Sequence, residues 1–135
     1  YAAYTVDHQV EHTLYENFTH IRPYAFRLGQ QEQLFVKTWI EMLIETCNIL
    51  IDKDAAKFLS FEHIKEMNGK KSKYISSKKD GMRKPHPLRE NLFLETNMSA
   101  NGVRNLILKM LKAYNIKATD YKIYYRADYT ELNQE

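Results

Sequence analysis

Apolar residues recur at intervals of three and four along two stretches of the chain, the spacing that places them on one face of an α-helix. The stretch that starts at residue 38 opens with Thr38 and Glu41, a capping box in which a hydroxyl and a carboxylate each accept a bond from an unpaired backbone N–H. Its apolar positions are Trp39, Ile40, Leu43, Ile44, Cys47, Leu50 and Ile51. The later stretch has the strongest periodicity in the chain, with Val103, Leu106, Ile107, Met110, Leu111 and Tyr114. Both stretches are therefore predicted to be helices whose apolar faces pack on the core.

A weaker stripe near the beginning has a spacing of four residues: Val10, Leu14 and Phe18. It predicts a helix over about residues 7–18, as part of an N-terminal helix or a linker from a preceding domain. Asp54 is expected to cap a short helical continuation of the first long helix, and Ser60 to cap another turn.

Strands are predicted between these helices. Residues 25–28 and 34–36 flank a polar turn, which is a hairpin signal. A short strand is expected at Tyr74–Ile75 and a buried strand at residues 92–94, and residues 121–127 alternate as a half-buried strand does. The order of elements predicts an α+β fold, with a small mixed or antiparallel sheet and helices packed on one face.

The length of 135 residues suits one domain, so residues 1–20 are assigned to a helix or linker and residues 21–135 to a single α+β domain. The chain begins at Tyr1, and we expect it to be part of a longer polypeptide. One cysteine, Cys47, excludes an internal disulfide framework and suits a reducing compartment. No apolar run approaches the roughly 20 residues that cross a bilayer. A cytoplasmic location without a membrane partner is therefore expected.

Positive charge is concentrated in residues 65–89. This segment contains nine Lys or Arg and two acidic residues, which gives a local net charge of +7. A row of such side chains can pair with phosphates and give sequence-independent affinity for nucleic acid. Tyr74 lies among them and can stack on an exposed base. Two alternatives to nucleic-acid binding remain for this segment: a loop that is only solvated, or a surface that docks onto an acidic partner. The predicted nucleic-acid-binding residues are Lys70, Lys71, Lys73, Tyr74, Lys78, Lys79, Arg83, Lys84 and Arg89.

A second anion-binding candidate precedes the last predicted helix, in "FLETNMSANGVRNL", residues 93–106. Ser99 is a good N-cap, and Asn97 and Arg104 lie beside the N–H groups of the first turn, which suit a phosphate. There is no GxGxxG or GxxxxGK[ST] motif, so no nucleotide fingerprint is present. Simple helix capping is the alternative.

Two patterns suggest metal chemistry without supplying a full site. "HQVEH", residues 8–12, matches a zinc-peptidase spacing, but spacing alone provides no third ligand. Asp120 and Lys122 resemble part of a metal-dependent nuclease site, which needs a further carboxylate on a neighbouring strand, with Glu95 as the candidate. Neither pattern is assigned, so we predict no catalytic residue, no metal and no cofactor.

Two segments carry a resemblance to a known class of proteins: "RPYAFRLGQQEQLFVKTWIEMLIETCNIL", residues 22–50, and "NLFLETNMSANGVRNLILKMLKAYNI", residues 91–116. Their order resembles carboxy-terminal accessory modules of bacterial restriction-like and mobile-element proteins. The resemblance implies a bacterial, intracellular setting beside DNA-processing domains, and it transfers no catalytic residue.

These patterns together predict a non-catalytic accessory domain of a larger bacterial protein that binds DNA or RNA through phosphate contacts of a basic loop. Another domain of the same polypeptide is a further expected partner. The alternative is a protein-interaction module that uses exposed aromatic residues such as Tyr124, or pairs a sheet edge with a partner strand.

Overall fold

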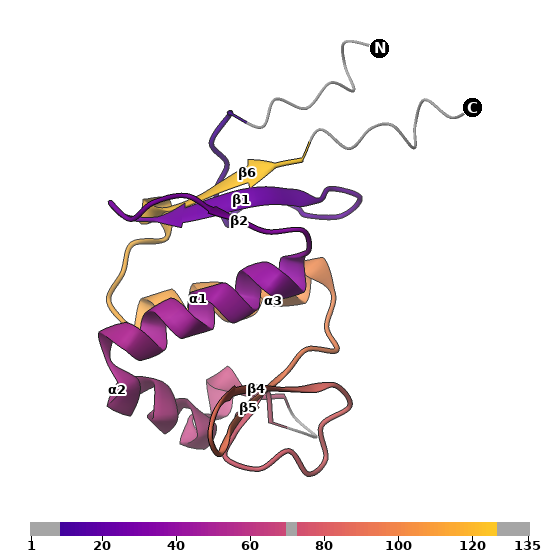
Figure 1. Ribbon diagram of the computed structural model, residues 1–135, viewed down its shortest axis with the longest axis vertical. Helices are drawn as coiled ribbons and strands as arrows, with labels where there is room; N and C mark the ends of the chain where they lie inside the picture. Colours follow the sequence, from indigo (N-terminus) through magenta and orange to yellow (C-terminus); the bar gives the residue numbers. More distant parts are fainter. Residues whose placement is uncertain (1–8, 70–72, 127–135) are drawn as a thin grey trace, which may run out of the picture.

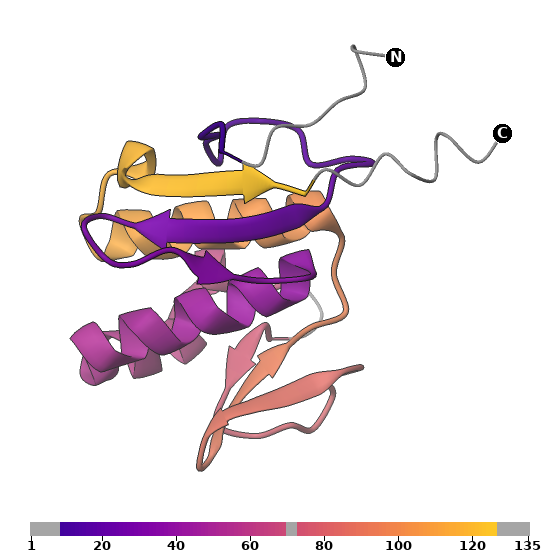
Figure 2. The same cartoon turned by 45° about the horizontal axis from the view of Figure 1, so that its top comes forward.

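The computed structural model describes residues 9–69 and 73–126 and has three layers (Figure 1). Two long helices lie in the middle, with one small sheet on each side of them (Figure 2). The elements, in chain order, are β1 (Pro23–Leu28), β2 (Leu34–Phe35), α1 (Trp39–Lys53), α2 (Ala55–Leu59), the 3₁₀ helices η2 (Ser60–His63) and η3 (Lys65–Met67), β3 (Ile75–Ser76), β4 (Pro85–Arg89), β5 (Leu92–Glu95), α3 (Ala100–Ala113), the 3₁₀ helix η4 (Ala118–Asp120) and β6 (Tyr121–Tyr125).

The predicted α+β fold is confirmed, and its strands are divided between two antiparallel sheets. The upper sheet in Figure 1 has the order β2-β1-β6, and the lower sheet has the order β3-β5-β4. The division arises because the last strand returns to the first hairpin, with Ile123 opposite Phe26, while the strands between the helices pair among themselves. The helices are therefore covered on both sides.

The predicted hairpin at the start of the first sheet is also confirmed. β1 pairs with β2, with Phe26 opposite Leu34. The turn between them begins at Gly29, whose φ of +63° is a conformation that favours glycine. The Gly29 N–H donates to the carbonyl of Asp120 at 2.8 Å, which ties the turn to the segment before β6.

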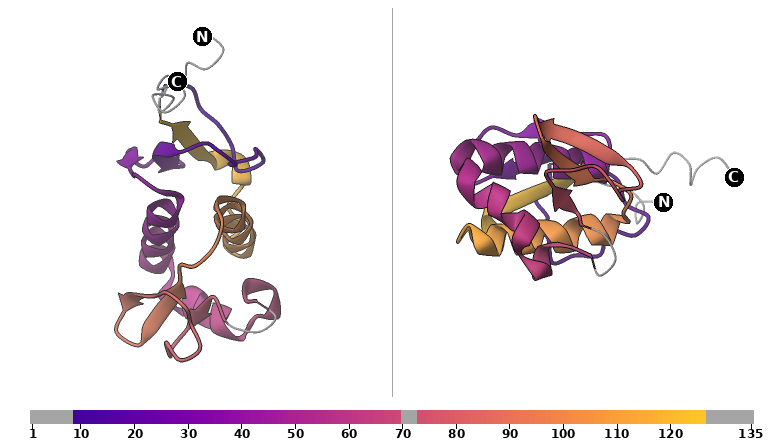
Figure 3. Two further views of the ribbon diagram at one scale, coloured as in Figure 1. Left: turned by 90° about the vertical axis from the view of Figure 1, so that its right-hand side faces the viewer. Right: turned by 90° about the horizontal axis from the view of Figure 1, so that it is seen from below.

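The apolar faces of α1 and α3 form the centre of the core. The left panel of Figure 3 shows the two helices side by side between the sheets, and its right panel shows the lower sheet from below. Most of both predicted stripes is buried: Leu43 and Cys47 of α1 and Val103 and Ile107 of α3 have no exposed surface. Ile40, Ile44 and Tyr114 are half-buried and pack against the core. Phe26 of the upper sheet and Leu94 of the lower sheet belong to the same continuous core.

The caps of α1 and α2 form as predicted, with one shift. The Thr38 hydroxyl accepts from the backbone N–H of Glu41 at 3.0 Å, and the Glu41 carboxylate accepts from Lys37, one residue before the cap. Asp54 caps α2 through the N–H of Lys57. The prediction for Ser60 is wrong: its hydroxyl donates to the carbonyl of Lys57 and so closes α2 rather than opening the next turn.

The helix predicted over residues 7–18 is also wrong in its described part, residues 9–18. His12 forms an antiparallel bridge with Ile123 of β6, with N–H···O distances of 2.8 and 2.9 Å. Leu14 and Phe18 are buried, so the apolar stripe marks core contacts of an irregular segment. Packing against β6 and α3 replaces helical bonding here, and the N–H of Phe18 is satisfied by the side chain of Asn101.

The sequence patterns do not predict strand β4, which contains Pro85 and Pro87. Proline lacks a backbone N–H and is tolerated at the edge of a sheet, and β4 is an edge strand that pairs only with β5 in its sheet.

Among the described residues, no helix combines the length and the apolar character needed to cross a bilayer.

One buried polar pair links the middle layer to the upper sheet. The Thr46 hydroxyl of α1 donates to the carbonyl of Met42 and pairs with the hydroxyl of Tyr121 of β6, and neither Thr46 nor Tyr121 has exposed surface. We expect Thr46→Val to lower the free energy of unfolding by about 1–3 kcal/mol, because it leaves the Tyr121 hydroxyl buried without a partner. Tyr121→Phe leaves Thr46 bonded to Met42 and should cost only about 0.5–1.5 kcal/mol.

Urea denaturation of both variants and of the double variant measures these costs. The double variant should lose less than the sum of the two single losses, because it removes both partners. A larger loss for Tyr121→Phe than for Thr46→Val would contradict this account of the pair.

Candidate nucleic-acid interface

The predicted basic segment is built around a loop between β3 and β4, residues 77–84, which we call the basic loop. A single side chain, Glu95 at the end of β5, holds its last part. The Glu95 carboxylate is only 4% exposed and accepts from the backbone N–H groups of Arg83 at 2.8 Å and Lys84 at 2.9 Å. It accepts a third bond from the N–H of Asn97 at 3.0 Å. The loop and the segment before α3 are thus fixed to the same carboxylate.

Further bonds order the rest of the basic loop. The carbonyl of Lys84 accepts from both the N–H and the hydroxyl of Thr96. At the other end, the Ser76 hydroxyl accepts from the N–H of Lys78. A turn at Asp80–Gly81, as predicted, is closed by a bond from Met82 to Lys79. The backbone of the loop is therefore held at both ends and at its turn.

Four basic side chains project from this backbone: Lys78, Lys79, Arg83 and Lys84. All four residues are exposed. Within the described part of the chain, none of the four forms an ion pair. Asp80 is the one acidic residue in the loop. The loop therefore presents a net positive charge that is not neutralised by the described residues around it.

The other residues of the predicted segment are in different surroundings. Lys73 lies 3.9 Å from the Glu62 carboxylate, and Arg89 pairs with Asp52 at 3.2 Å. Tyr74 is half-buried and packs against the core. Lys70 and Lys71 lie outside the described residues.

Asn68 fixes the beginning of the basic segment, a role that the sequence patterns did not reveal. Its side-chain N–H₂ donates to the carbonyls of Phe61 and Ile64, both at 2.9 Å. Its side-chain oxygen accepts from the N–H groups of Tyr74 and Ile75. One amide thus joins η2 to β3 across the connection between them.

The three residues of the second predicted anion site lie in different surroundings. Ser99 caps α3 by accepting from the N–H of Gly102 at 3.0 Å, which confirms the capping alternative. Arg104 donates to the carbonyl of Glu16 and to the side chain of Asn105. The Asn97 N–H is bound to Glu95. The three residues therefore serve three different contacts.

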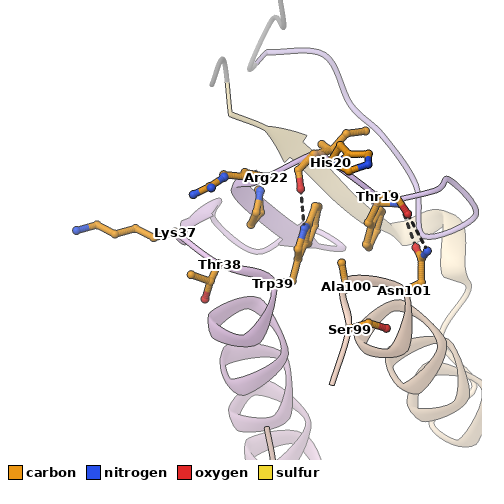
Figure 4. Close-up of a pocket in the computed structure, with 12 residues that line it drawn as sticks. Thr19, His20, Arg22, Lys37, Thr38, Trp39, Ser99, Ala100 and Asn101 are labelled. Carbon is orange, nitrogen blue, oxygen red and sulfur yellow. Dashed lines mark hydrogen bonds between the residues drawn. The ribbon is translucent and has the colours of Figure 1, made fainter. Parts of the chain in front are cut away.

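Ser99 instead lines a pocket of about 500 Å³ where α1 and α3 begin (Figure 4). The pocket lies between three chain segments, residues 18–23, 37–39 and 99–101. Its basic residues are His20, Arg22 and Lys37. Arg22 and Lys37 lie outside the two segments in which basic sites were predicted. The sequence patterns missed them because the two residues are far apart in sequence and only the fold brings them to one pocket.

The patterns that suggested metal chemistry do not form a site among residues 9–69 and 73–126, where no group of three potential ligand residues is close enough to hold a metal ion. Glu95 belongs to the lower sheet, whereas Asp120 and Lys122 belong to η4 and β6 on the upper sheet, so they are not on neighbouring strands. Of the zinc-like pattern, His8 lies outside the described residues and Glu11 pairs with Arg27 at 3.0 Å.

Cys47 is a core residue, as its place in the helical stripe predicts. It has no exposed surface, and burial raises the pKa of its thiol. A thiol in this state is a poor nucleophile.

Comparisons of this chain with protein-family models, with curated proteins and with solved structures find no match. The chemistry of the basic loop and of the pocket therefore carries the functional conclusion.

The carboxylate of Glu95 gives a prediction about pH. Burial raises its pKa, but the backbone N–H groups that it accepts from lower the pKa by more, so the net pKa lies below the ordinary value of 4.5. The unfolded chain therefore binds this proton more readily, and the contribution of Glu95 to stability is lost as the pH falls below about 4.5. We expect Glu95→Gln to lower the free energy of unfolding at pH 7 by at least about 2 kcal/mol, because bonds to a charged acceptor are lost.

Denaturation curves of both proteins between pH 7 and pH 3 test this. The difference between wild type and Glu95→Gln should be largest near neutral pH and should shrink in acid. A difference that stays constant with pH would show that the charge of Glu95 does not stabilise the loop.

Proposed function

We propose that this protein is a non-catalytic accessory domain of a larger bacterial protein, and that its basic loop binds the phosphate backbone of DNA or RNA. The observation that supports this most strongly is the set of four exposed basic side chains on an ordered loop, without a carboxylate partner among the described residues. Cations of this kind release counterions from a nucleic acid when they pair with its phosphates, which is the main source of sequence-independent affinity.

The order of the loop favours such binding. A loop that is disordered before binding must lose conformational entropy when it binds, which weakens the complex. In this protein the bonds to Glu95 and Thr96 already hold Arg83 and Lys84. At these two residues, only the side chains remain to be ordered by the phosphates.

The residue types favour contact with the backbone of the nucleic acid over reading of its bases. Three of the four side chains are lysines, which bind phosphate as point charges. Reading of bases relies more on Arg, Asn and Gln in a groove-sized element. Lys73 and Arg89 contribute less in this proposal, since each already has a carboxylate partner.

The setting of the domain is part of the proposal. The resemblance to accessory modules of bacterial restriction-like and mobile-element proteins suggests a cytoplasmic protein in which another domain processes DNA. The basic loop would then hold the substrate while the other domain acts on it.

The proposal predicts that binding depends steeply on salt. Fluorescence anisotropy with a labelled duplex oligonucleotide, measured over a range of salt concentrations, gives the slope of log affinity against log salt. Replacing Lys78, Lys79, Arg83 and Lys84 by Ala should reduce this slope by about two to four, because each phosphate contact contributes about 0.9.

A control variant with the same change in charge separates local contacts from net charge. Lys53, Lys109, Lys112 and Lys117 are also exposed and lie outside the basic loop. Their replacement by Ala should leave most of the slope in place. Equal losses in the two variants would contradict a role for the basic loop, and no binding by the wild type at low salt would contradict the proposed function.

A second candidate, protein interaction, is favoured by the edge strand β2. Phe35 is 66% exposed and Leu34 is 37% exposed at this edge of the upper sheet. An extended partner strand can pair with such an edge and cover such side chains. Tyr124, which the sequence predicts to be exposed, is only 7% exposed and donates to Glu11, although it lines the same pocket as Phe35.

A further inference from the structure

We propose that the pocket at the beginnings of α1 and α3 binds a phosphate of the same nucleic acid that the basic loop binds. This inference rests on the proposed function and deepens it, because it adds the pocket at the beginnings of α1 and α3 to an interface that otherwise consists of the basic loop. The pocket would be a second contact for a continuous strand, formed by residues that are distant in sequence.

The charge of the pocket suits a phosphate. Three of its lining residues, His20, Arg22 and Lys37, have basic side chains, and no lining residue is acidic. Figure 4 shows Arg22 and Lys37 on the same side of the rim, with their side chains extending outward from it. The carboxylate of Glu41, which follows in α1, accepts from the backbone N–H of Lys37, and Lys37 has no ion pair within the described residues.

Hydroxyl groups complete the polar part of the lining. Thr38 and Ser99 line the pocket from the two helices, and Thr19 lines it from the segment above them. Each of these groups can donate a bond to a phosphate oxygen, as Ser and Thr often do at nucleic-acid backbones. Asn101 holds Thr19 in place by donating to its hydroxyl at 3.2 Å.

A short segment of chain links the pocket to the basic loop. The carbonyl of Lys84 accepts from the N–H of Thr96 at 3.0 Å, and Ser99 of the pocket lies three residues further along the chain. Three residues span at most about 11 Å. A strand of duplex DNA carries one phosphate about every 3.4 Å along the helix axis, so a short run of nucleotides can reach both places. In Figure 1 this connecting segment runs up the right-hand side, from the lower sheet to the start of α3.

The floor of the pocket is rigid and supplies a probe. Trp39 stacks on Phe18 with ring centroids 4.1 Å apart, and its indole N–H donates to the carbonyl of Ile21 at 2.8 Å. Trp39 is also the one tryptophan of the sequence. Its fluorescence therefore reports on the surroundings of this pocket.

The test combines two readouts on the full chain, with unlabelled and labelled forms of one duplex oligonucleotide. The first is the emission of Trp39 during titration at low salt, and the second is the salt slope of anisotropy for the variant Arg22→Gln/Lys37→Gln. The emission of the wild type should change with the same midpoint as the anisotropy. The variant should lose about one to two units of slope, at about 0.9 for each phosphate contact.

Two controls make the result specific. Lys109→Gln/Lys117→Gln removes the same charge from exposed positions outside the pocket and should keep the slope. The single variant Lys37→Arg keeps the positive charge and should keep the slope too. Because Lys37 is exposed, Lys37→Gln alone provides a variant that folds if the double variant does not.

The outcomes separate the two proposals. If the basic-loop variant loses slope while Arg22→Gln/Lys37→Gln does not, the proposed function stands and the pocket proposal is wrong. The pocket proposal is also wrong if Trp39 emission does not respond to an oligonucleotide that binds. If the wild type binds no oligonucleotide at low salt, both proposals are wrong.

Discussion

Helices α1 and α3 are the constraint on which the rest of this structure depends, because each sheet buries its apolar face against them. Each three-stranded sheet is hydrophobic on one face and must bury that face against another layer. The pair of helices serves both sheets, as Phe26 and Leu94 show by joining one core from opposite sides. The buried face of α1 must therefore be wide, and Met42 and Thr46 are buried although they lie outside the apolar stripe that the sequence predicts.

This arrangement has a consequence for the surface. The two helices lie side by side, and both begin on the side of the molecule where the segment between β5 and α3 passes (Figure 1). Glu95 stands at the start of that segment and binds the backbone of the basic loop as well as Asn97. One buried carboxylate therefore fixes the backbone at Arg83 and Lys84, two of the four basic residues of the loop. The pocket with Arg22 and Lys37 lies at the other end of the same segment.

The long elements could be predicted from the sequence because their signals are local. The period of α1 and α3, the caps at Thr38, Asp54 and Ser99, and the hairpin at Gly29 depend on residues within a few positions of one another. The concentration of charge in residues 65–89 is equally local. These local features are sufficient to predict the fold class and the position of the basic loop.

The remaining features depend on contacts between distant segments. His12 pairs with Ile123, so an apolar stripe that looked helical belongs to an irregular segment. β4 contains two prolines that only its edge position accommodates. The bonds of Glu95 and Asn68 to backbone N–H groups leave no pattern in the sequence, because any residue can supply the N–H. The pocket is formed by three segments that are distant in sequence, and no local signal could have predicted that Arg22 and Ser99 line the same pocket.

The most direct test of the central claim is to map where an oligonucleotide binds, from the backbone amide shifts of ¹⁵N-labelled protein during an NMR titration at low salt. We predict that the largest shifts fall in the basic loop, followed by residues 37–39 and 99–101, while Leu34 and Phe35 of β2 shift little. Largest shifts at β2, or shifts of equal size over the whole surface, would contradict the account and favour the edge strand or non-specific attraction.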